Sequence, residues 1–79
     1  MNNYESLSER EKEVLKLYTL GKHRSQIARI LIVSHATVCS HLSNIFNKLG
    51  VNNKEKASII YWQNNLSELE NISPKEMLN

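Results

Sequence analysis

The sequence predicts an all-α domain built from four helices. Apolar residues recur at helical spacing along most of the chain, and no stretch of any length alternates between apolar and polar residues as a strand would. Only two glycines and one proline interrupt the chain of 79 residues, which is long enough for one small core. We expect a flexible arm over residues 1–6, a helical domain over residues 7–65 and an acidic tail over residues 66–79.

The first helix is predicted from about Glu9 to Leu20. Ser8 and Glu11 have the Ser-x-x-Glu spacing of a capping box, in which each side chain satisfies a backbone N–H of the other residue. Gly21 is expected to end the helix, because glycine enters the left-handed region without a Cβ clash. The residues expected to face the core are Val14, Leu17 and Tyr18.

The second helix follows a polar turn and is predicted to end near Leu31. Its start is ambiguous, because His23 and Gln26 make only a poor capping box, whereas Ser25 as the cap would give a shorter helix. Residues 32–33 are too few for another element and form a turn. The residues expected on the inner side are Ile27, Ile30 and Leu31, with Ala28 allowing close approach.

The third helix is predicted over residues 34–49, between Ser34 as a cap and Gly50 as a stop. Together with the second helix it forms a helix-turn-helix, in which it would be the reading helix. One apolar stripe consists of Val38, Leu42, Ile45 and Leu49. The opposite face consists of Ala36, Ser40, Ser43, Asn44 and Asn47. A small, hydrogen-bonding face without carboxylates suits a DNA major groove, and it equally suits the solvated side of an ordinary amphipathic helix.

The fourth helix is predicted to begin at Asn52 or Asn53, with Asn52 and Glu55 as the better capping box. So small a core cannot cover every apolar residue of this helix. Ile59 and Trp62 are therefore expected either to contact a second copy of the chain or to lie under the tail. The residues expected to pack inward are Ala57, Ile60 and Tyr61.

Charge favours a polyanionic partner over an acidic small molecule. The net charge is only +2, but residues 22–56 carry +5 while both flanking segments are negative. The charged residues of this block are Lys22, Arg24, Arg29, Lys48, Lys54, Lys56 and Glu55. A chance cluster of surface lysines is the alternative.

Other functional classes find little support in the sequence. One cysteine excludes an internal disulfide, and we expect a reducing cytoplasm. His35 and Cys39 stand four residues apart, but two ligands do not make a metal site, so no metal or cofactor is expected. No grouping of catalytic residues indicates an enzyme, and no run is long enough to span a membrane.

Residues 7–62 resemble the LuxR-type (GerE-like) DNA-binding domain. The matching positions are Leu7-Ser8-x-Arg10-Glu11-x-Glu13-Val14-Leu15-x-Leu17, Gly21, Ile27-Ala28, Leu31, Ser34-x-x-Thr37-Val38-x-x-His41-Leu42-x-x-Ile45-x-x-Lys48-Leu49-x-Val51 and Ala57. The resemblance implies four helices with a helix-turn-helix in the second and third. It further implies sequence-specific DNA binding and transcription regulation, usually by a dimer formed through the fourth helix. The chain is similar to the stand-alone GerE type or to an effector domain of a longer protein.

The chain departs from the family pattern at the reading helix. The family usually has Lys or Arg after the Thr-Val pair, where this chain has Cys39, and it often contacts bases through the positions of Cys39, Ser40 and Ser43. The opening of the second helix reads His23-Arg24-Ser25-Gln26 rather than a small cap followed by Asn-Lys-Glu. Loss of one cation that is bidentate to guanine costs about 1–3 kcal/mol of DNA binding.

These observations give two hypotheses of function. The first is a transcription regulator that binds double-stranded DNA as a homodimer, with another regulator or RNA polymerase as further partners. Its predicted DNA-binding residues are Arg24, Ser25, Thr37, Cys39, Ser40, His41, Ser43, Asn44, Lys48 and Lys54. Its predicted dimer residues are Ile59, Tyr61 and Trp62. The second is an interaction module that pairs with another regulator through those dimer residues and binds DNA weakly. For individual residues the alternatives are that His41 packs at the helix edge, that Thr37 supports the cap, and that the lysines are only solvated.

Overall fold

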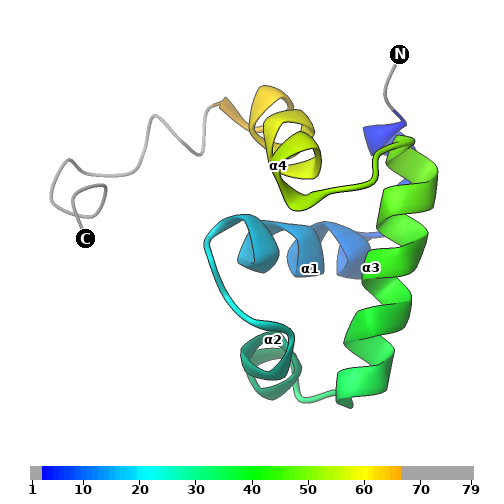
Figure 1. The fold of residues 1–79 in the computed structure, drawn as a ribbon. Helices are drawn as coiled ribbons and strands as arrows, with labels where there is room; N and C mark the ends of the chain where they lie inside the picture. Colours follow the sequence, from blue (N-terminus) through cyan, green and yellow to red (C-terminus); the bar gives the residue numbers. More distant parts are fainter. Residues whose placement is uncertain (1–2, 67–79) are drawn as a thin grey trace, which may run out of the picture.

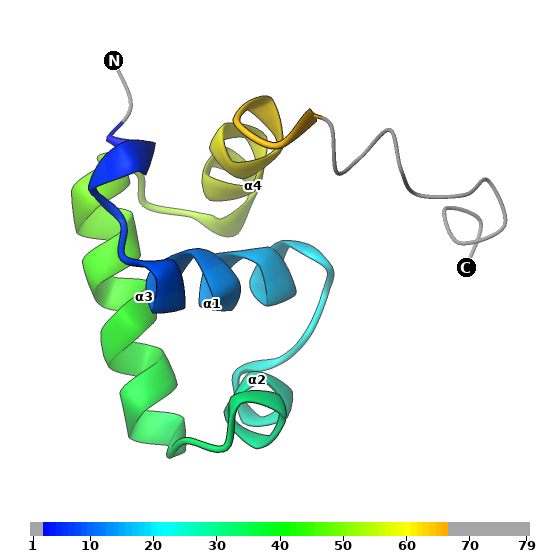
Figure 2. The ribbon, with the colours of Figure 1, turned by 180° about the vertical axis from the view of Figure 1, so that it is seen from behind.

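A computed structural model describes residues 3–66, and all regular structure in this range is helical. A short 3-10 turn, η1, covers Tyr4–Ser6 and leads into α1 (Glu9–Thr19). The remaining helices are α2 (Arg24–Leu31), α3 (His35–Leu49) and α4 (Lys54–Gln63). The upright α3 lies along one side, and α1 lies between α4 and α2 (Figures 1 and 2). The predicted all-α fold with a helix-turn-helix in α2 and α3 is confirmed.

The core forms where all four helices meet. The apolar stripe predicted for α3 is buried, as expected from its spacing. The largest fully buried side chains are Leu15, Ile27, Leu42, Ile45, Val14 and Val38. Each such side chain stabilises the fold by about 1.5–3 kcal/mol relative to its exposure to water. Ile30 was expected on the inner side but is 50% exposed, because it lies at the edge of the face that α2 turns toward α1.

Hydrogen bonds confirm most of the predicted helix ends. Ser8 Oγ accepts from the N–H of Glu11 at 3.1 Å, and the N–H of Ser8 donates to Glu11 Oε1 at 2.9 Å. The helix ends at Thr19, and the N–H of Lys22 donates to Leu17 O across Gly21, whose φ is +93°. This is the capping box and the glycine stop that the sequence predicts.

Two caps that the sequence left open are resolved. At α2 the N–H of His23 donates to Gln26 Oε1 at 2.8 Å, so the helix begins after His23 rather than after Ser25. At α4 Asn53 Oδ1 accepts from the N–H of Lys56 at 2.8 Å. The preference for Asn52 as the cap of α4 was therefore wrong, because the helix begins at Lys54 and only Asn53 stands next to its first turn.

Tyr4–Ser6, within the predicted flexible arm, are part of the fold. Tyr4 is only 6% exposed and meets the ring of Tyr61 edge-on, with the ring centres 6.0 Å apart. Asn65 Nδ2 donates to the Tyr4 hydroxyl at 3.0 Å. The predicted arm over residues 1–6 is thus wrong at Tyr4–Ser6, because an aromatic side chain there completes the core. The predicted acidic tail lies outside the described residues, except for Leu66.

A charged pair joins α1 to the last turn of α3. Glu11 is 5% exposed, and its Oε1 accepts from Lys48 Nζ at 2.8 Å. Lys48 Nζ also donates to Ser6 O at 3.3 Å. Burial by itself raises the pKa of Glu11, but the hydrogen bonds from Lys48 and Ser8 and the charge of Lys48 bring that pKa below its ordinary value of 4.5. The pair therefore fixes the angle between the two helices.

No helix among residues 3–66 is long and apolar enough to cross a bilayer.

The turn between α2 and α3 contains a strained residue. Ile32 has φ +58° and is 90% exposed, so its side chain gains little from burial while its backbone is left-handed. The left-handed conformation costs a residue with a Cβ about 1–2 kcal/mol, and Asn tolerates it better than a β-branched residue does. We expect Ile32→Asn to raise the free energy of unfolding by about 1 kcal/mol in urea titrations. Ile59→Asn, at an exposed helical position, is the control and should not stabilise. An Ile32→Asn protein no more stable than the parent would contradict this account.

The Glu11–Lys48 pair predicts a dependence of stability on pH. Because folding lowers the Glu11 pKa, the carboxylate contributes stability above pH 4.5 that is lost as the pH falls through the lower folded value. Glu11→Gln keeps the capping geometry but removes the charge. We expect it to be less stable than the parent near neutral pH, and the difference to shrink steadily below pH 4.5. Urea titrations across this range measure it. Glu5→Gln, which removes a carboxylate whose side chain is 86% exposed, should show a small difference with no such trend.

Candidate nucleic-acid interface

The outer face of α3 is exposed along its whole length. Its residues are Ala36, Ser40, Ser43, Asn44 and Asn47, and every one of them is exposed. None carries a charge, and α3 contains no carboxylate. The predicted polar face therefore lies on the surface, where it presents hydroxyl and amide groups on a slim helix.

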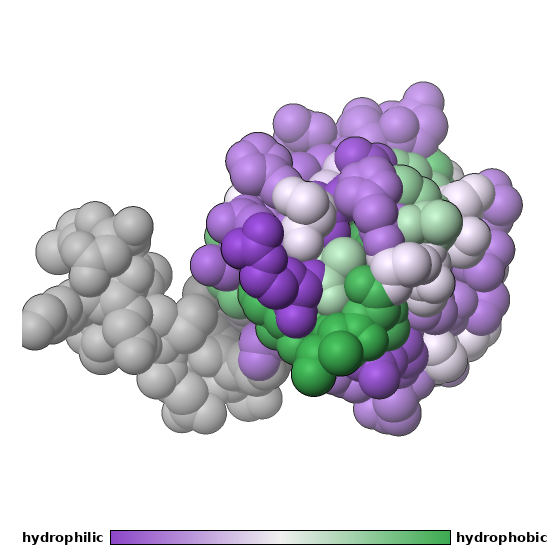
Figure 3. Space-filling model, turned by 90° about the horizontal axis from the view of Figure 1, so that it is seen from below, coloured by the Kyte–Doolittle hydropathy of each residue, from purple (hydrophilic) through white to green (hydrophobic). Residues whose placement is uncertain are grey.

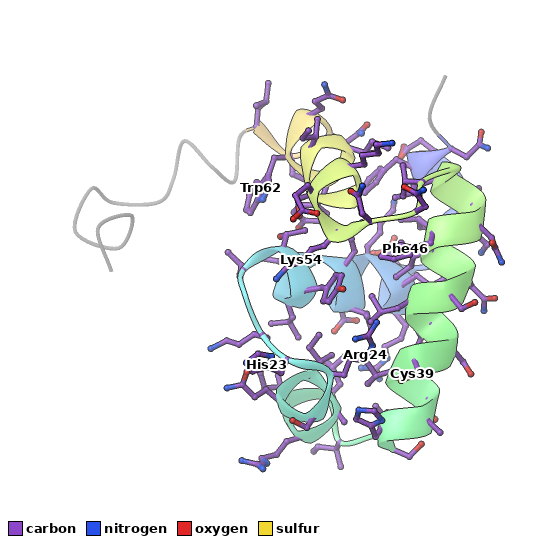
Figure 4. All side chains as sticks on the ribbon, viewed as in Figure 1. His23, Arg24, Cys39, Phe46, Lys54 and Trp62 are labelled. Atoms are coloured by element: carbon purple, nitrogen blue, oxygen red, sulfur yellow. The ribbon has the colours of Figure 1, made fainter. Side chains whose placement is uncertain are left out.

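Residues on the two edges of α3 have different surroundings. At about 100° per residue, Cys39, Ser43 and Phe46 fall on one edge, and Thr37, His41 and Lys48 fall on the other. Figure 4 shows Cys39 and Phe46 on the side of α3 that is turned toward Arg24 and Lys54. The structure thus brings Cys39 and Ser43 to the edge that faces those two cations, and it places Ser40 and the remaining predicted residues of α3 elsewhere on the helix.

Two cations converge on the ring of Tyr18. Lys54 Nζ lies 5.0 Å from the ring centre, and Arg24 Cζ lies 5.7 Å from it. The ring in turn packs at a tilt against Phe46, with the centres 6.3 Å apart. A cation over an aromatic face gains about 0.5–1 kcal/mol at an exposed site. Tyr18 therefore holds the first residues of α2 and α4 beside α3.

This arrangement concentrates positive potential next to the exposed outer face of α3, which we call the reading face. Arg24 and Lys54 are the first residues of their helices, where unpaired backbone N–H groups add to the positive charge. Within residues 3–66, neither cation pairs with a carboxylate. Ser25 is exposed in the same first turn as Arg24. Phosphate groups on this side of α3 would meet guanidinium, ammonium and backbone donors.

The sequence did not reveal this role of Tyr18 and Phe46. Tyr18 was expected only in the core, and Phe46 was not assigned to either face of α3. The seven-residue spacing of Cys39 and Phe46 on one edge was the only local signal. The contact between Tyr18 and the two cations joins three separate helices, so no local pattern indicates it.

Two predicted DNA contacts have structural roles here. The hydroxyl of Thr37 lies 2.8 Å from Ser34 Oγ, and its N–H donates to the same oxygen at 3.0 Å, so Thr37 supports the cap of α3. Lys48 holds the buried Glu11, as described above. His41 is half-buried at the edge of α3.

Cys39 does not belong to a larger metal-binding cluster. Its Sγ lies 3.6 Å from His35 Nδ1, one turn earlier on α3. Among residues 3–66, no group of three or more His, Cys, Asp or Glu side chains could hold a metal ion. The pair therefore remains a half-buried thiol next to an exposed imidazole.

The three predicted dimer residues of α4 differ in how far they are exposed to solvent. Ile59 is 57% exposed and available for a partner. Trp62 is half-buried and meets the ring of Tyr61 edge-on at 5.0 Å. Tyr61 itself is only 3% exposed, so its assignment to the interface was wrong: it belongs to the core, where it packs on Tyr4.

Comparison with known proteins agrees with this geometry. Residues 5–61 match the family described as "Bacterial regulatory proteins, luxR family". Over 58 residues, 73% of this chain, it is 41% identical to the CsgBAC operon transcriptional regulatory protein of Escherichia coli. Over 63 residues, 80% of this chain, it is 41% identical to the response regulator protein VraR of Staphylococcus aureus. The chain covers 26% and 30% of those two relatives, between a quarter and a third of their length. The matched segment contains α1, α2, α3 and all but the last two residues of α4, and the chain therefore belongs to the LuxR family of bacterial regulatory proteins.

Proposed function

We propose that this chain regulates transcription by binding double-stranded DNA through α3. One observation carries the proposal: the uncharged outer face of α3 lies beside Arg24 and Lys54, which share the ring of Tyr18. Membership of the LuxR family supports it, as do relatives named as a transcriptional regulatory protein and a response regulator. Such a role needs no catalytic chemistry and places the protein with the bacterial chromosome in the cytoplasm.

The reading face suits the major groove in size and chemistry. A helix with its side chains is about 10–12 Å across, and the major groove is about 12 Å wide, so small residues on the outer face permit close approach. Ser40 and Ser43 would hydrogen-bond to base edges. Asn44 would offer the two-pronged geometry that suits adenine. Cys39 would contribute an uncharged contact where the family usually has a cation.

The flanking cations would hold the sugar–phosphate backbone. Arg24 and Ser25 at the start of α2 would meet one phosphate, and Lys54 at the start of α4 another. His41 would approach the backbone from the opposite edge of α3. We leave Lys48 out of the binding surface, because its ammonium group already serves the buried carboxylate of Glu11.

Salt dependence tests the assignment of Arg24 and Lys54. Removing a cation that neutralises one phosphate should lower the slope of log K against log salt by about 0.9. We expect Arg24→Gln and Lys54→Gln each to weaken binding several-fold on duplexes of any sequence and to show this lower slope, measured by fluorescence anisotropy. Lys56→Gln is the matched control, because Lys56 is exposed on the same helix about 200° around its axis from Lys54. Equal effects of Lys54→Gln and Lys56→Gln would show that DNA binding depends on the overall charge of the helix rather than on Lys54. If the parent protein does not bind DNA at low salt, the result would favour the interaction module.

We also propose that two copies bind together through α4. Ile59 is the exposed apolar residue that supports this interface, with the half-buried Trp62 beside it on the helix. A two-fold dimer would place two copies of α3 on half-sites one helical turn of DNA apart. Another regulator or RNA polymerase would be a further partner of the assembled dimer.

A substitution on α4 separates dimerisation from folding. Ile59→Asp places a charge in the proposed interface without disturbing the core, so we expect a monomer of parental helicity in sedimentation velocity. Its binding to a two-half-site duplex should fall to that of a single half-site. Glu55→Gln, at another exposed position of α4, is the control and should remain dimeric. A dimer that survives Ile59→Asp would place the interface elsewhere.

A further inference from the structure

The reading face of α3 has no side chain suited to guanine or cytosine. It consists of Ala36, Ser40, Ser43, Asn44 and Asn47, all of them exposed. Figure 3 shows mostly hydrophilic residues on the right-hand side of the molecule, where α3 lies in Figure 1. In the major groove guanine presents two acceptors that suit arginine or lysine, and cytosine presents a donor that suits a carboxylate. The reading face has neither kind of side chain, so a G·C pair would meet no preferred partner on it.

The cations around α3 are held away from this face. Lys54 Nζ and Arg24 Cζ lie 5.0 and 5.7 Å from the ring centre of Tyr18, at the flank of α3. Lys48 Nζ donates to Glu11 Oε1 at 2.8 Å, on the side of α3 that faces α1. Each of these cations therefore already has a partner that keeps it from the base edges.

The two histidines of α3 lie at the edges of the reading face. At about 100° per residue, His35 and His41 fall about 140° and 100° around the helix axis from Ser40. His35 Nδ1 lies 3.6 Å from Cys39 Sγ, and His41 is half-buried. Neither imidazole stands at the centre of the face, where a base pair would meet α3.

The carboxamide of Asn44 suits adenine. Adenine presents an acceptor at N7 next to a donor at N6, and a carboxamide offers the matching donor and acceptor. Against guanine the oxygen of the carboxamide would face a second acceptor, so only one of the two hydrogen bonds could form. Asn44 is exposed, and within residues 3–66 no hydrogen bond occupies its side chain. Both of its hydrogen-bonding groups are therefore available to a base.

Ala36 offers a contact to thymine. It is exposed in the first turn of α3, and the N-terminal residues of a recognition helix are the ones that contact base edges. Thymine carries a methyl group in the major groove, which alanine contacts without losing a hydrogen bond. Ala36 and Asn44 are eight residues apart, or about 12 Å along the helix axis at 1.5 Å per residue. This length corresponds to about three to four base-pair steps of 3.4 Å.

We propose that α3 selects A·T over G·C pairs at the two ends of the half-site that it reads. Thymine would lie beside Ala36 and adenine beside Asn44, about three to four base pairs apart. Ser40 and Ser43 lie between them, and a hydroxyl can donate to or accept from any base, so the intervening pairs are less restricted. The proposal rests on the proposed function and adds to it the bases that the DNA site contains.

Selection from a library of random duplexes tests the proposal on the whole 79-residue chain. The bound fraction should show two enriched A·T positions, about three to four base pairs apart. Asn44→Ala should remove the preference at the adenine position and keep the one at the thymine position. Asn52→Ala is the matched control, because Asn52 is exposed outside α3 and caps no helix. It should select the same bases as the parent.

A gain of preference gives a second, positive test. Ser43→Arg places a guanidinium group on the exposed reading face without touching the core. We expect it to enrich guanine at one position between the two A·T pairs by about fivefold or more, because a bidentate arginine discriminates to that extent. Circular dichroism should show parental helicity for this variant. A Ser43→Arg protein that folds and selects no guanine would contradict the assignment of this face to the bases.

Uracil in place of the selected thymine tests the contact of Ala36 alone, because it removes only the methyl group. Loss of one buried methyl should weaken binding about fourfold in fluorescence anisotropy. The same replacement at a thymine outside the half-site is the control and should leave the affinity unchanged. Equal affinities for the thymine and uracil half-sites would show that Ala36 does not read this position.

The selection also distinguishes this proposal from DNA binding itself. A parent protein that binds no duplex at low salt would overturn both. A parent that binds duplexes but enriches G·C pairs, or no base at all, would overturn this proposal and leave DNA binding in place. An A·T preference that Asn44→Ala does not change would come from DNA shape rather than from α3, and would also overturn the proposal.

Discussion

The fold depends on α1, because every other helix packs on it and each of its faces has a different neighbour. Leu15 and Val14 fill the core, Glu11 reaches Lys48 of α3, and Tyr18 meets the first residues of α2 and α4. The buried Glu11 carboxylate is the strictest constraint. A buried charge without a partner costs several kcal/mol, so α3 must place Lys48 within hydrogen-bond distance. That requirement sets the orientation of the reading helix relative to the rest of the domain.

The helices could be predicted from the sequence because their caps, stops and apolar stripes depend on residues close together in the chain. The stripe of α3, the Ser8–Glu11 box and the Gly21 and Gly50 stops depend on neighbours within about one turn of helix, so the sequence contains all the information needed. The start of α4 was misjudged because Asn52 and Asn53 are both good caps, and only packing decides between them. Ile30 was misjudged for a similar reason: its position at the edge of a helical face depends on how far α1 extends over α2.

The candidate site was only partly predictable, because its main contacts join distant parts of the chain. The exposed face of α3 followed from periodicity. The stacking of Arg24 and Lys54 on one ring did not, since those residues come from α2, α4 and α1 and meet only in the folded chain. Lys48 shows the reverse case. It belongs to the basic block and to the family pattern, yet its partner Glu11 lies 37 residues away and gives it a structural role. The charge of a segment thus says less about DNA binding than the position of each cation.

This chain has Cys39 where the family usually has a Lys or Arg on the reading helix. The difference changes which residues would supply the affinity for DNA and which would supply the sequence specificity. With no charge on the outer face of α3, attraction to phosphate would come from the flanks, at Arg24 and Lys54, and contacts to phosphate carry no sequence preference of their own. Sequence preference must then come from hydroxyl and amide groups at Ser40, Ser43 and Asn44, each a weaker contact than a bidentate arginine. One copy would hold DNA loosely and distinguish sequences modestly. Two copies on paired half-sites would combine both effects, because discrimination at separate positions is roughly additive. The uncharged outer face of α3 and the exposed Ile59 of α4 therefore support the same proposal, in which two copies of this domain would recognise DNA together.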